Sequence, residues 1–237
     1  MSEAGSARHI GIFGGTFDPP HAGHLIVAQD AALALGLDRI LFVPAARPPH
    51  KRGATVSEPA QRAEMLARAI AGDDRFSMDT LELDRAGASY TVDTLRELAG
   101  RNPAAHWTLL IGADQYGEFH TWREPDVIRS LARIAVLMRA GRTGTGAEAD
   151  ATDGTPGRAA SSESAGGPAV ADLIRPRVRD LEHGDVALDV TRIDISATAV
   201  RARVAAGLPI RYLVPRAVEE FIFERKLYTR NGTPVAG

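Results

Sequence analysis

The stretch that decides the fold is Gly14-Gly15-Thr16-Phe17-Asp18-Pro19-Pro20-His21-Ala22-Gly23-His24. It follows an apolar, β-prone run at residues 9–13 and precedes a run rich in Ala and Leu at residues 25–35, which predicts strand, loop and helix in that order. A glycine turn lets the backbone approach a phosphate closely, and the helix that follows offers unpaired N–H groups and a positive dipole end. We therefore expect a phosphate-binding loop in which the contacts come from Gly14, Gly15, Thr16, Phe17 and Gly23.

Two imidazoles stand at the mouth of this helix. His21 and His24 are three residues apart, so they can face one way once the helix has begun. Together they could donate hydrogen bonds to phosphate oxygens whose charge grows during transfer. A helix-capping pair or half of a metal site is the alternative. Zinc usually takes three or four protein ligands, and this chain has no cysteine and no partner at a recognisable spacing, which makes metal ligation the weaker explanation.

A second string with similar chemistry lies near the other end of the chain, at Ile195-Ser196-Ala197-Thr198-Ala199-Val200-Arg201. It follows a β-like run at residues 186–190 and opens a predicted helix, with Ser196 or Thr198 as the N-cap. Arg201 can add a planar charged fork to a polyphosphate. Taken alone, the string fits a capped surface helix with a solvated arginine equally well.

In this order, the two strings resemble the two signatures of the nucleotidylyltransferase superfamily, which also includes the class I aminoacyl-tRNA synthetases. Four strings between them are similar to the bacterial nicotinate mononucleotide adenylyltransferase branch, and the resemblance covers nearly the whole chain apart from one insertion. These strings are Pro48-Pro49-His50-Lys51, Ala88-Ser89-Tyr90-Thr91, Ile111-Gly112-Ala113-Asp114 and Phe119-His120-Thr121-Trp122.

The resemblance gives the first and third of these strings roles near ATP and the reacting phosphates. The loop that bears His50 and Lys51 would close over those phosphates, although a basic surface loop is the plain alternative. Gly112 would allow close backbone approach, and Asp114 could accept hydrogen bonds from ribose hydroxyls beside the adenosine half. For Asp114, helix capping is the competing interpretation.

The other two strings would form the pocket for the pyridine ring. Ser89 or Thr91 is the expected cap of a helix at residues 92–99, and by resemblance the cap region, Tyr90 included, receives the pyridine carboxylate. A helix N-terminus favours a carboxylate over a neutral carboxamide by up to about 2 kcal/mol when partly buried. Aromatic residues make up only 5% of the chain and Trp122 has polar neighbours, which argues against a mere filler role, and the resemblance implies that it stacks on the pyridine ring. A plain helix cap and a core tryptophan remain the alternatives.

The resemblance implies one reaction, in which nicotinate mononucleotide attacks the α-phosphate of ATP and releases pyrophosphate. His21 and His24 would steady the α-phosphate and the leaving group, while Arg201 and the helix start at Ser196 would hold the β- and γ-phosphates. Mg²⁺ is the expected cofactor, held mainly by phosphates and water, so no protein ligand is assigned and Asp18 is only an outer-shell candidate.

Three other functions stay open. A nicotinamide mononucleotide adenylyltransferase would use the same fold and reaction with a different pyridine pocket. A phosphopantetheine adenylyltransferase would share the first loop, but members of that family are shorter and carry threonine where this chain has His21. The non-enzyme alternative is a nucleotide-binding sensor that keeps the fold without turnover.

Composition excludes several classes of protein. The formal net charge is −2 and the pI is about 6.4, so the chain has no general basic footprint for nucleic acid and the expected partners are small molecules. Residues 1–8 lack the apolar core of a signal peptide, and no apolar run approaches the roughly 20 residues that span a bilayer. These observations predict a cytoplasmic enzyme. The same observations are compatible with a homo-oligomer.

The predicted architecture is a single α/β domain with a Rossmann-like doubly wound parallel sheet and a small C-terminal helical lobe at residues 196–228. This follows from alternating β-like and helical runs. Besides those given above, the expected strands lie at residues 39–43, 76–83, 107–111 and 133–138, and the expected helices at 59–71 and 125–131. Residues 141–169 contain no large apolar side chain and predict a disordered insertion, and the ends at 1–7 and 229–237 are expected to be flexible.

Overall fold

The computed structural model describes residues 8–46, 57–85, 87–139 and 176–229. Several sequence predictions therefore lie outside the described residues. They are the disordered insertion at 141–169, the flexible end at 1–7, nearly all of the end at 229–237, and the His50–Lys51 loop.

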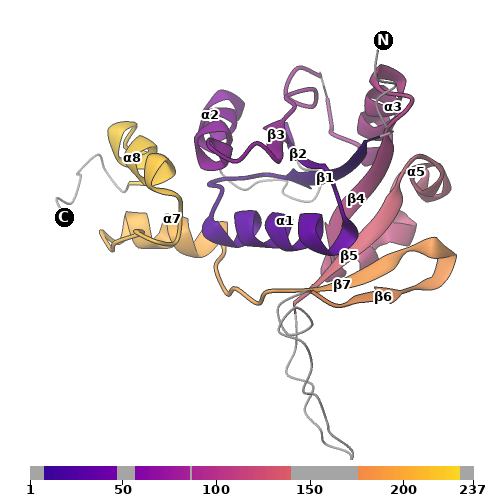
Figure 1. Ribbon diagram of the computed structural model, residues 1–237. Helices are drawn as coiled ribbons and strands as arrows, with labels where there is room; N and C mark the ends of the chain where they lie inside the picture. The colour runs from indigo at the N-terminus through magenta and orange to yellow at the C-terminus, as the bar shows by residue number, and fades with distance from the viewer. Residues whose placement is uncertain (1–7, 47–56, 86, 140–175, 230–237) are drawn as a thin grey trace, which may run out of the picture.

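One seven-stranded sheet organises the described residues, in the order β3-β2-β1-β4-β5-β7-β6 (Figure 1). Neighbouring strands are parallel except for β6, which runs antiparallel to β7. Strand order reverses between β1 and β4, so the predicted doubly wound fold is confirmed. The strands are β1 (His9–Gly15), β2 (Arg39–Pro44), β3 (Phe76–Met78), β4 (His106–Gly112), β5 (Arg133–Arg139), β6 (Val178–Asp180) and β7 (Val186–Val190).

Helices cover both faces of the sheet because alternate strand residues point to opposite sides. On β5, Ile134 and Val136 join the apolar cluster beneath α3 and α5, whereas Ala135 and Leu137 join the cluster beneath α1 and α2. The helices are α1 (Ala22–Leu35), α2 (Pro59–Ile70), α3 (Thr91–Arg101), α4 (Ala113–Gly117), α5 (Pro125–Leu131), α7 (Ala197–Ala205) and α8 (Arg216–Glu224), with short 3-10 turns η1 (Phe119–Thr121) and η2 (Glu182–Gly184).

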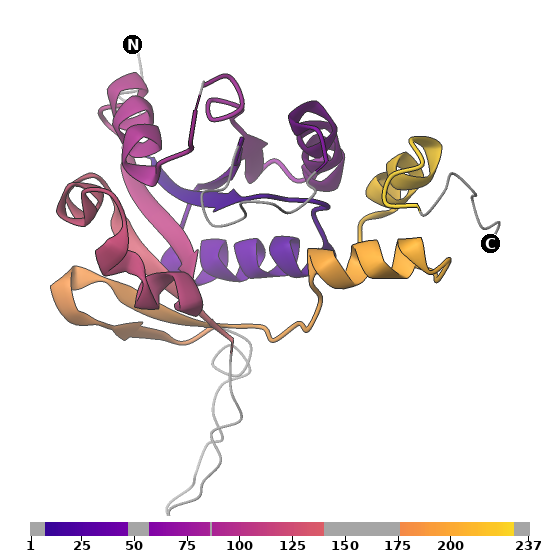
Figure 2. The same ribbon diagram turned by 180° about the vertical axis from the view of Figure 1, so that it is seen from behind.

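The last two helices pack beside α1 and α2, at the end of the molecule away from α3 and α5 (Figures 1 and 2). Met65 and Ala69 of α2 share a buried cluster with Val200, Val218 and their neighbours in α7 and α8. The chain turns between these helices after Ala205, and Gly207 has a φ of 69°. In the described part of the chain, every helix is too short or too polar to cross a membrane.

Three boundaries differ from the sequence prediction. The strand expected at 76–83 ends at Met78, because Asp79 accepts the Leu81 N–H and Thr80 accepts the Leu83 N–H in a turn. Strand β1 continues through Gly14 and Gly15 in place of breaking there, and α1 begins three residues early, at Ala22. The antiparallel edge strand β6 was not predicted, because three exposed residues carry no apolar pattern.

Candidate active site

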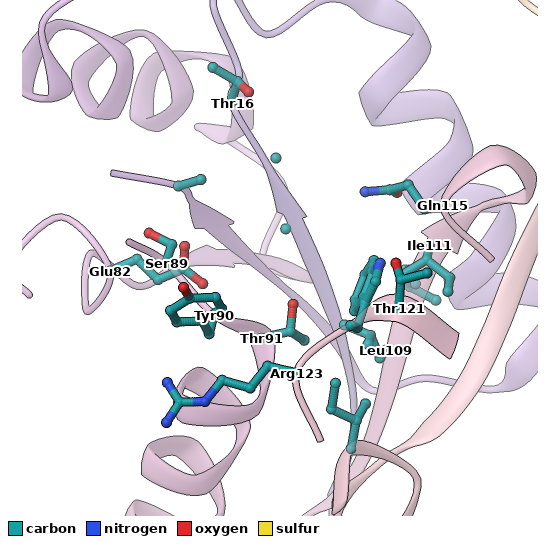
Figure 3. A pocket seen from close by; sticks show the side chains of 16 residues that line it. Thr16, Glu82, Ser89, Tyr90, Thr91, Leu109, Ile111, Gln115, Thr121 and Arg123 are labelled. Carbon is teal, nitrogen blue, oxygen red and sulfur yellow. The ribbon is translucent and has the colours of Figure 1, made fainter. Parts of the chain in front are cut away.

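A cavity of about 340 Å³ opens where the strand order reverses, at the carboxyl ends of β1 and β4 (Figure 3). Open α/β sheets bind their ligands at this point. Three elements supply most of the wall: the loop after β1, the start of α3, and the segment between η1 and α5. The lining residues are Gly14, Gly15, Thr16, Ala45, Glu82, Ser89, Tyr90, Thr91, Leu109, Leu110, Ile111, Gln115, Thr121, Trp122, Arg123 and Ile128.

The glycine loop keeps its shape through aromatic packing beneath it. Phe17 is buried at a φ of 47°, and its ring lies 5.7 Å from that of Phe42 and 5.1 Å from that of His24. A Cβ on Gly15 would stand 2.9 Å from Phe17 Cζ, which leaves room only for glycine there. Phe17 therefore faces the core, and of the predicted loop contacts Gly14, Gly15 and Thr16 line the cavity.

The two histidines form one stacked unit at the start of α1. Their ring centroids are 3.6 Å apart with an interplanar angle of 24°, and His24 Nδ1 accepts a hydrogen bond from the His21 N–H at 3.1 Å. A neutral His24 consequently carries its proton on Nε2, the nitrogen that can donate. His21 is 7% exposed, and a Cβ on Gly23 would lie 3.1 Å from its Nδ1. Gly23 thus makes room for the imidazole.

The second signature begins α7, as predicted, and contacts the first. Ser196 is the N-cap, and its Oγ accepts from the Ala199 N–H at 3.1 Å. Arg201 donates through Nη2 to Thr198 Oγ1 at 3.3 Å and through Nη1 to the carbonyl of Asp18 at 2.7 Å. Strings 183 residues apart in the chain therefore meet beside the histidines.

Asp18 lies beneath this contact and is 2% exposed. Its carboxylate accepts from the Tyr228 hydroxyl at 2.6 Å and from the Ser57 N–H at 3.3 Å. Burial, and next the hydrogen bond to Asp18, raise the pKa of Tyr228 well above its usual value, so the phenol keeps its proton and donates it. Both oxygens of Asp18 thus already accept protein hydrogen bonds, and its outer-shell role toward Mg²⁺ stays a prediction. Among the described residues, no cluster of three His, Cys, Asp or Glu side chains could hold a metal ion.

The start of α3 forms the part of the cavity wall where the mononucleotide, the acceptor substrate, is expected, and we call it the acceptor wall. The cap predicted for this helix is wrong. The N-cap is Tyr90, Thr91 is the first helical residue, and no described side chain caps the helix. Ser89 lies one position before the N-cap, and its Oγ accepts the Ala46 N–H at 3.2 Å. The first N–H groups of α3 therefore meet the cavity without a side-chain acceptor from the described residues, which suits a ligand anion.

Trp122 also lines the cavity, between its neighbours Thr121 and Arg123. It is half-buried, with its ring 5.3 Å from that of Phe119, so one side of the indole is supported by the core. Arg123 follows it, and its guanidinium lies 5.0 Å from the centre of the Tyr90 ring. Trp122, Arg123 and the start of α3 therefore belong to one cavity.

Sequence reasoning missed four polar lining residues: Glu82, Gln115, Thr121 and Arg123. Glu82 is 8% exposed and accepts from Thr94 Oγ1 at 2.7 Å. Burial raises the pKa of its carboxyl group, against the hydrogen bonds of Thr94 and Ser89. The sequence signal for Glu82 was its position between Leu81 and Leu83, because an acidic residue flanked by large apolar residues predicts a buried carboxyl group.

Not every predicted site residue lines the cavity. Outside its lining are Phe17, His21, Gly23, His24, Ser196, Thr198 and Arg201, and also Gly112 and Asp114. Asp114 is exposed on α4, and the Gly112 N–H donates to Gln115 Oε1 at 3.1 Å. Neither residue lines the cavity wall. Their predicted roles toward ATP therefore remain predictions.

Comparison with known proteins fits this geometry. The sequence profile of the family described as cytidylyltransferase-like matches residues 12–203. A protein from Rubrobacter xylanophilus named "Probable nicotinate-nucleotide adenylyltransferase" is 37% identical, over 96% of this chain and 95% of its own length. One of the same name from Thermus thermophilus is 39% identical, over 92% and 98%.

The fold is also shared with a solved structure, that of Plasmodium falciparum nicotinic acid mononucleotide adenylyltransferase complexed with NaAD. The TM-score is 0.64 at 16% identity, and the match covers 93% of this chain and 97% of that one. At this identity the likeness concerns architecture alone. Together with the profile and the close relatives, it leads to one conclusion: this chain belongs to the cytidylyltransferase-like family, in the branch of the nicotinate-nucleotide adenylyltransferases.

Proposed function

We propose that this chain is a nicotinate mononucleotide adenylyltransferase, which transfers AMP from ATP to nicotinate mononucleotide and yields nicotinate adenine dinucleotide and pyrophosphate. The observation that carries the proposal is the uncapped start of α3, which lines one cavity together with Trp122 and residues 14–16. A helix start suits the pyridine carboxylate, and the indole face suits the ring. Relatives named for this activity support the assignment.

The reaction needs positioning more than proton transfer. A phosphate oxygen of the mononucleotide forms the new bond to the α-phosphorus of ATP, while the bond to the bridging oxygen breaks and pyrophosphate leaves with that electron pair. The attacking phosphate is already ionised near neutral pH, since its second pKa is about 6. No general base is therefore required, and catalysis comes from alignment and charge stabilisation.

In this mechanism His21 and His24 donate to the oxygens of the α-phosphate and the leaving group. Ser196 and Arg201 act on the β- and γ-phosphates from the start of α7. The Arg201 contact with the Asp18 carbonyl supports this role, because it keeps the guanidinium beside the histidine loop before ATP arrives. Preorganised donors of this kind are the usual source of electrostatic catalysis.

Mg²⁺ would share the charge of the phosphates. The described residues offer no cluster that fits a protein-held ion, so the ion would enter on the phosphate oxygens of ATP. The hydrogen-bond donors in this mechanism all come from the chain's own residues.

The test is pyrophosphate release with Mg-ATP and, in parallel, nicotinate mononucleotide, nicotinamide mononucleotide or phosphopantetheine, with the product identified by mass. Strong preference for nicotinate mononucleotide is the expected result. Activity with the amide alone would keep the reaction and overturn the pocket assignment at Tyr90, Thr91 and Trp122. Activity with phosphopantetheine alone would move the chain to that reaction, and inactivity with all three would favour a nucleotide-binding sensor.

A further inference from the structure

A buried arginine that does not itself line the cavity is hydrogen-bonded to segments that do. Arg62 lies on α2 and is 1% exposed. It stands at the core-facing positions of this helix together with Met65, Leu66 and Ala69, a spacing that normally holds apolar side chains. Burial lowers the pKa of its guanidinium, and the nearby Asp18 carboxylate opposes this shift. A charge buried at such a cost needs compensating contacts.

The compensation comes from four backbone carbonyls on three separate segments. Nη1 donates to Thr16 O at 3.0 Å and to Ala45 O at 2.7 Å, Nη2 donates to Ala46 O at 3.1 Å, and Nε donates to Ser57 O at 3.1 Å. Thr16 belongs to the phosphate loop. Ala45 and Ala46 follow strand β2, and Ser57 precedes α2. The guanidinium therefore braces the phosphate loop against the end of β2, beside the Ala45 N–H that donates to the Gly15 carbonyl at 2.9 Å.

The chain of contacts continues to the acceptor wall. The Ala46 N–H donates to Ser89 Oγ at 3.2 Å, directly before Tyr90 and Thr91. Thr16 and Ala45 line the cavity at one end of this chain, and Ser89 lines it at the other. Hence a single side chain outside the cavity relates the loop expected to hold ATP to the wall expected to hold the mononucleotide.

Resting on the proposed function, we infer that Arg62 is a positioning residue for the transfer, which sets the alignment of the two substrates without touching either. The planar fork of arginine can direct donors at several carbonyls at once, whereas a lysine ammonium is one compact point with three donors. Alignment errors of about 1 Å cost on the order of 10²-fold in rate. The effect should therefore fall on turnover and leave the binding of each substrate nearly intact.

The experiment compares Arg62→Lys and Arg62→Met with a control on the same helix, Arg68→Met. Arg68 pairs with Glu64 at 2.8 Å on the surface and has no contact with the loops of the cavity among the described residues. For each variant, kcat and the KM of both substrates are measured with the acceptor that the parent chain uses best. ATP binding alone is measured by calorimetry. Thermal unfolding sets an assay temperature at which every variant is folded.

For Arg62→Lys we expect kcat to fall about 10²-fold while the KM values and ATP affinity change less than about threefold, with Arg68→Met near the parent. A folded Arg62→Lys with parental kcat would overturn the inference. So would a loss that lies wholly in KM, or an equal loss in Arg68→Met. If the Arg62→Met variant does not fold, the Arg62→Lys variant alone still tests the inference. An inactive parent chain would instead contradict the proposed function. Failure of the proposed function can therefore be distinguished from failure of the inference about Arg62.

Discussion

Two regions expected to bind the two substrates are prepared in opposite ways: the paired signature strings, called the donor side, and the cavity wall at the start of α3, called the acceptor side. On the donor side, the protein fills its own hydrogen bonds: Ser196 caps α7, Arg201 holds the Asp18 carbonyl, and His24 accepts the His21 N–H. On the acceptor side, α3 begins at Tyr90 with no cap from a described side chain. The donor side is thus set before substrate arrives, whereas the acceptor side leaves polar groups for the ligand. Changes on the donor side should act on kcat, and changes on the acceptor side on KM.

The largest expected effect is on the donor side, in His24→Ala. Loss of a preorganised donor should lower kcat by about 10²–10³ and leave the protein folded, because the residue is proposed to act on the reacting phosphates. Steady-state kinetics and circular dichroism check this. His9→Ala is a matched control, since His9 lies on the same strand-to-helix unit at the far end of β1. A His24→Ala variant with full activity would remove the histidine from the mechanism.

A smaller effect, on KM, is expected on the acceptor side. Trp122→Ala should raise the KM of the mononucleotide about 10-fold, since stacking on an aromatic ring contributes roughly 1–3 kcal/mol per base. The KM of ATP should stay near the parental value. Trp122→Phe, which keeps a ring, should restore most of the affinity. Equal changes in both KM values would mean that the two sides are not separate.

The smallest expected effect is on the pH dependence of the unfolding free energy, through the buried carboxyl group of Glu82. Burial raises the pKa of Glu82 above its usual 4.5, so the folded state keeps the proton to higher pH than the unfolded chain does. Its contribution to stability is then fully present below pH 4.5 and is lost as pH rises through the raised pKa. Glu82→Gln does not titrate, so its unfolding free energy relative to the parent should rise with pH across this window.

Urea unfolding of both proteins at a series of pH values measures this difference. Any constant cost of the substitution cancels, because only the change with pH is compared. A difference that is the same at every pH would mean that Glu82 has its ordinary pKa in the folded protein.

The sequence predicted the elements whose pattern is local. The β7 and α5 boundaries agree with the expected residues, and Ser196 is the N-cap, because apolar periodicity and capping chemistry are read from neighbouring positions. Predictions that depend on distant partners were weaker. The cap predicted at Ser89 or Thr91 is wrong because Tyr90 is the N-cap, and the Ser89 oxygen instead accepts the N–H of Ala46, 43 residues away. No local pattern contains that information.

The site shows the same limit. Thr16, Tyr90 and Trp122 were found through their strings, and they line the cavity. Glu82 and Arg62 were missed because their importance arises from burial, which follows from the packing of whole helices and strands. Charged residues at core-facing positions, such as Arg62 among Met65, Leu66 and Ala69, are the sequence signal that would have identified them.

The hydrogen bond between Tyr228 and Asp18 has a consequence for anyone who engineers this protein. Residues 210 positions apart are joined beneath the histidine loop, and the Ala22 N–H is likewise held by the Leu213 carbonyl. A truncation that ends at α8 would remove a proton donor from Asp18 and loosen the first signature from below. Fusion partners and cleavable tags should therefore be attached beyond Tyr228, so that its hydrogen bond to Asp18 is kept.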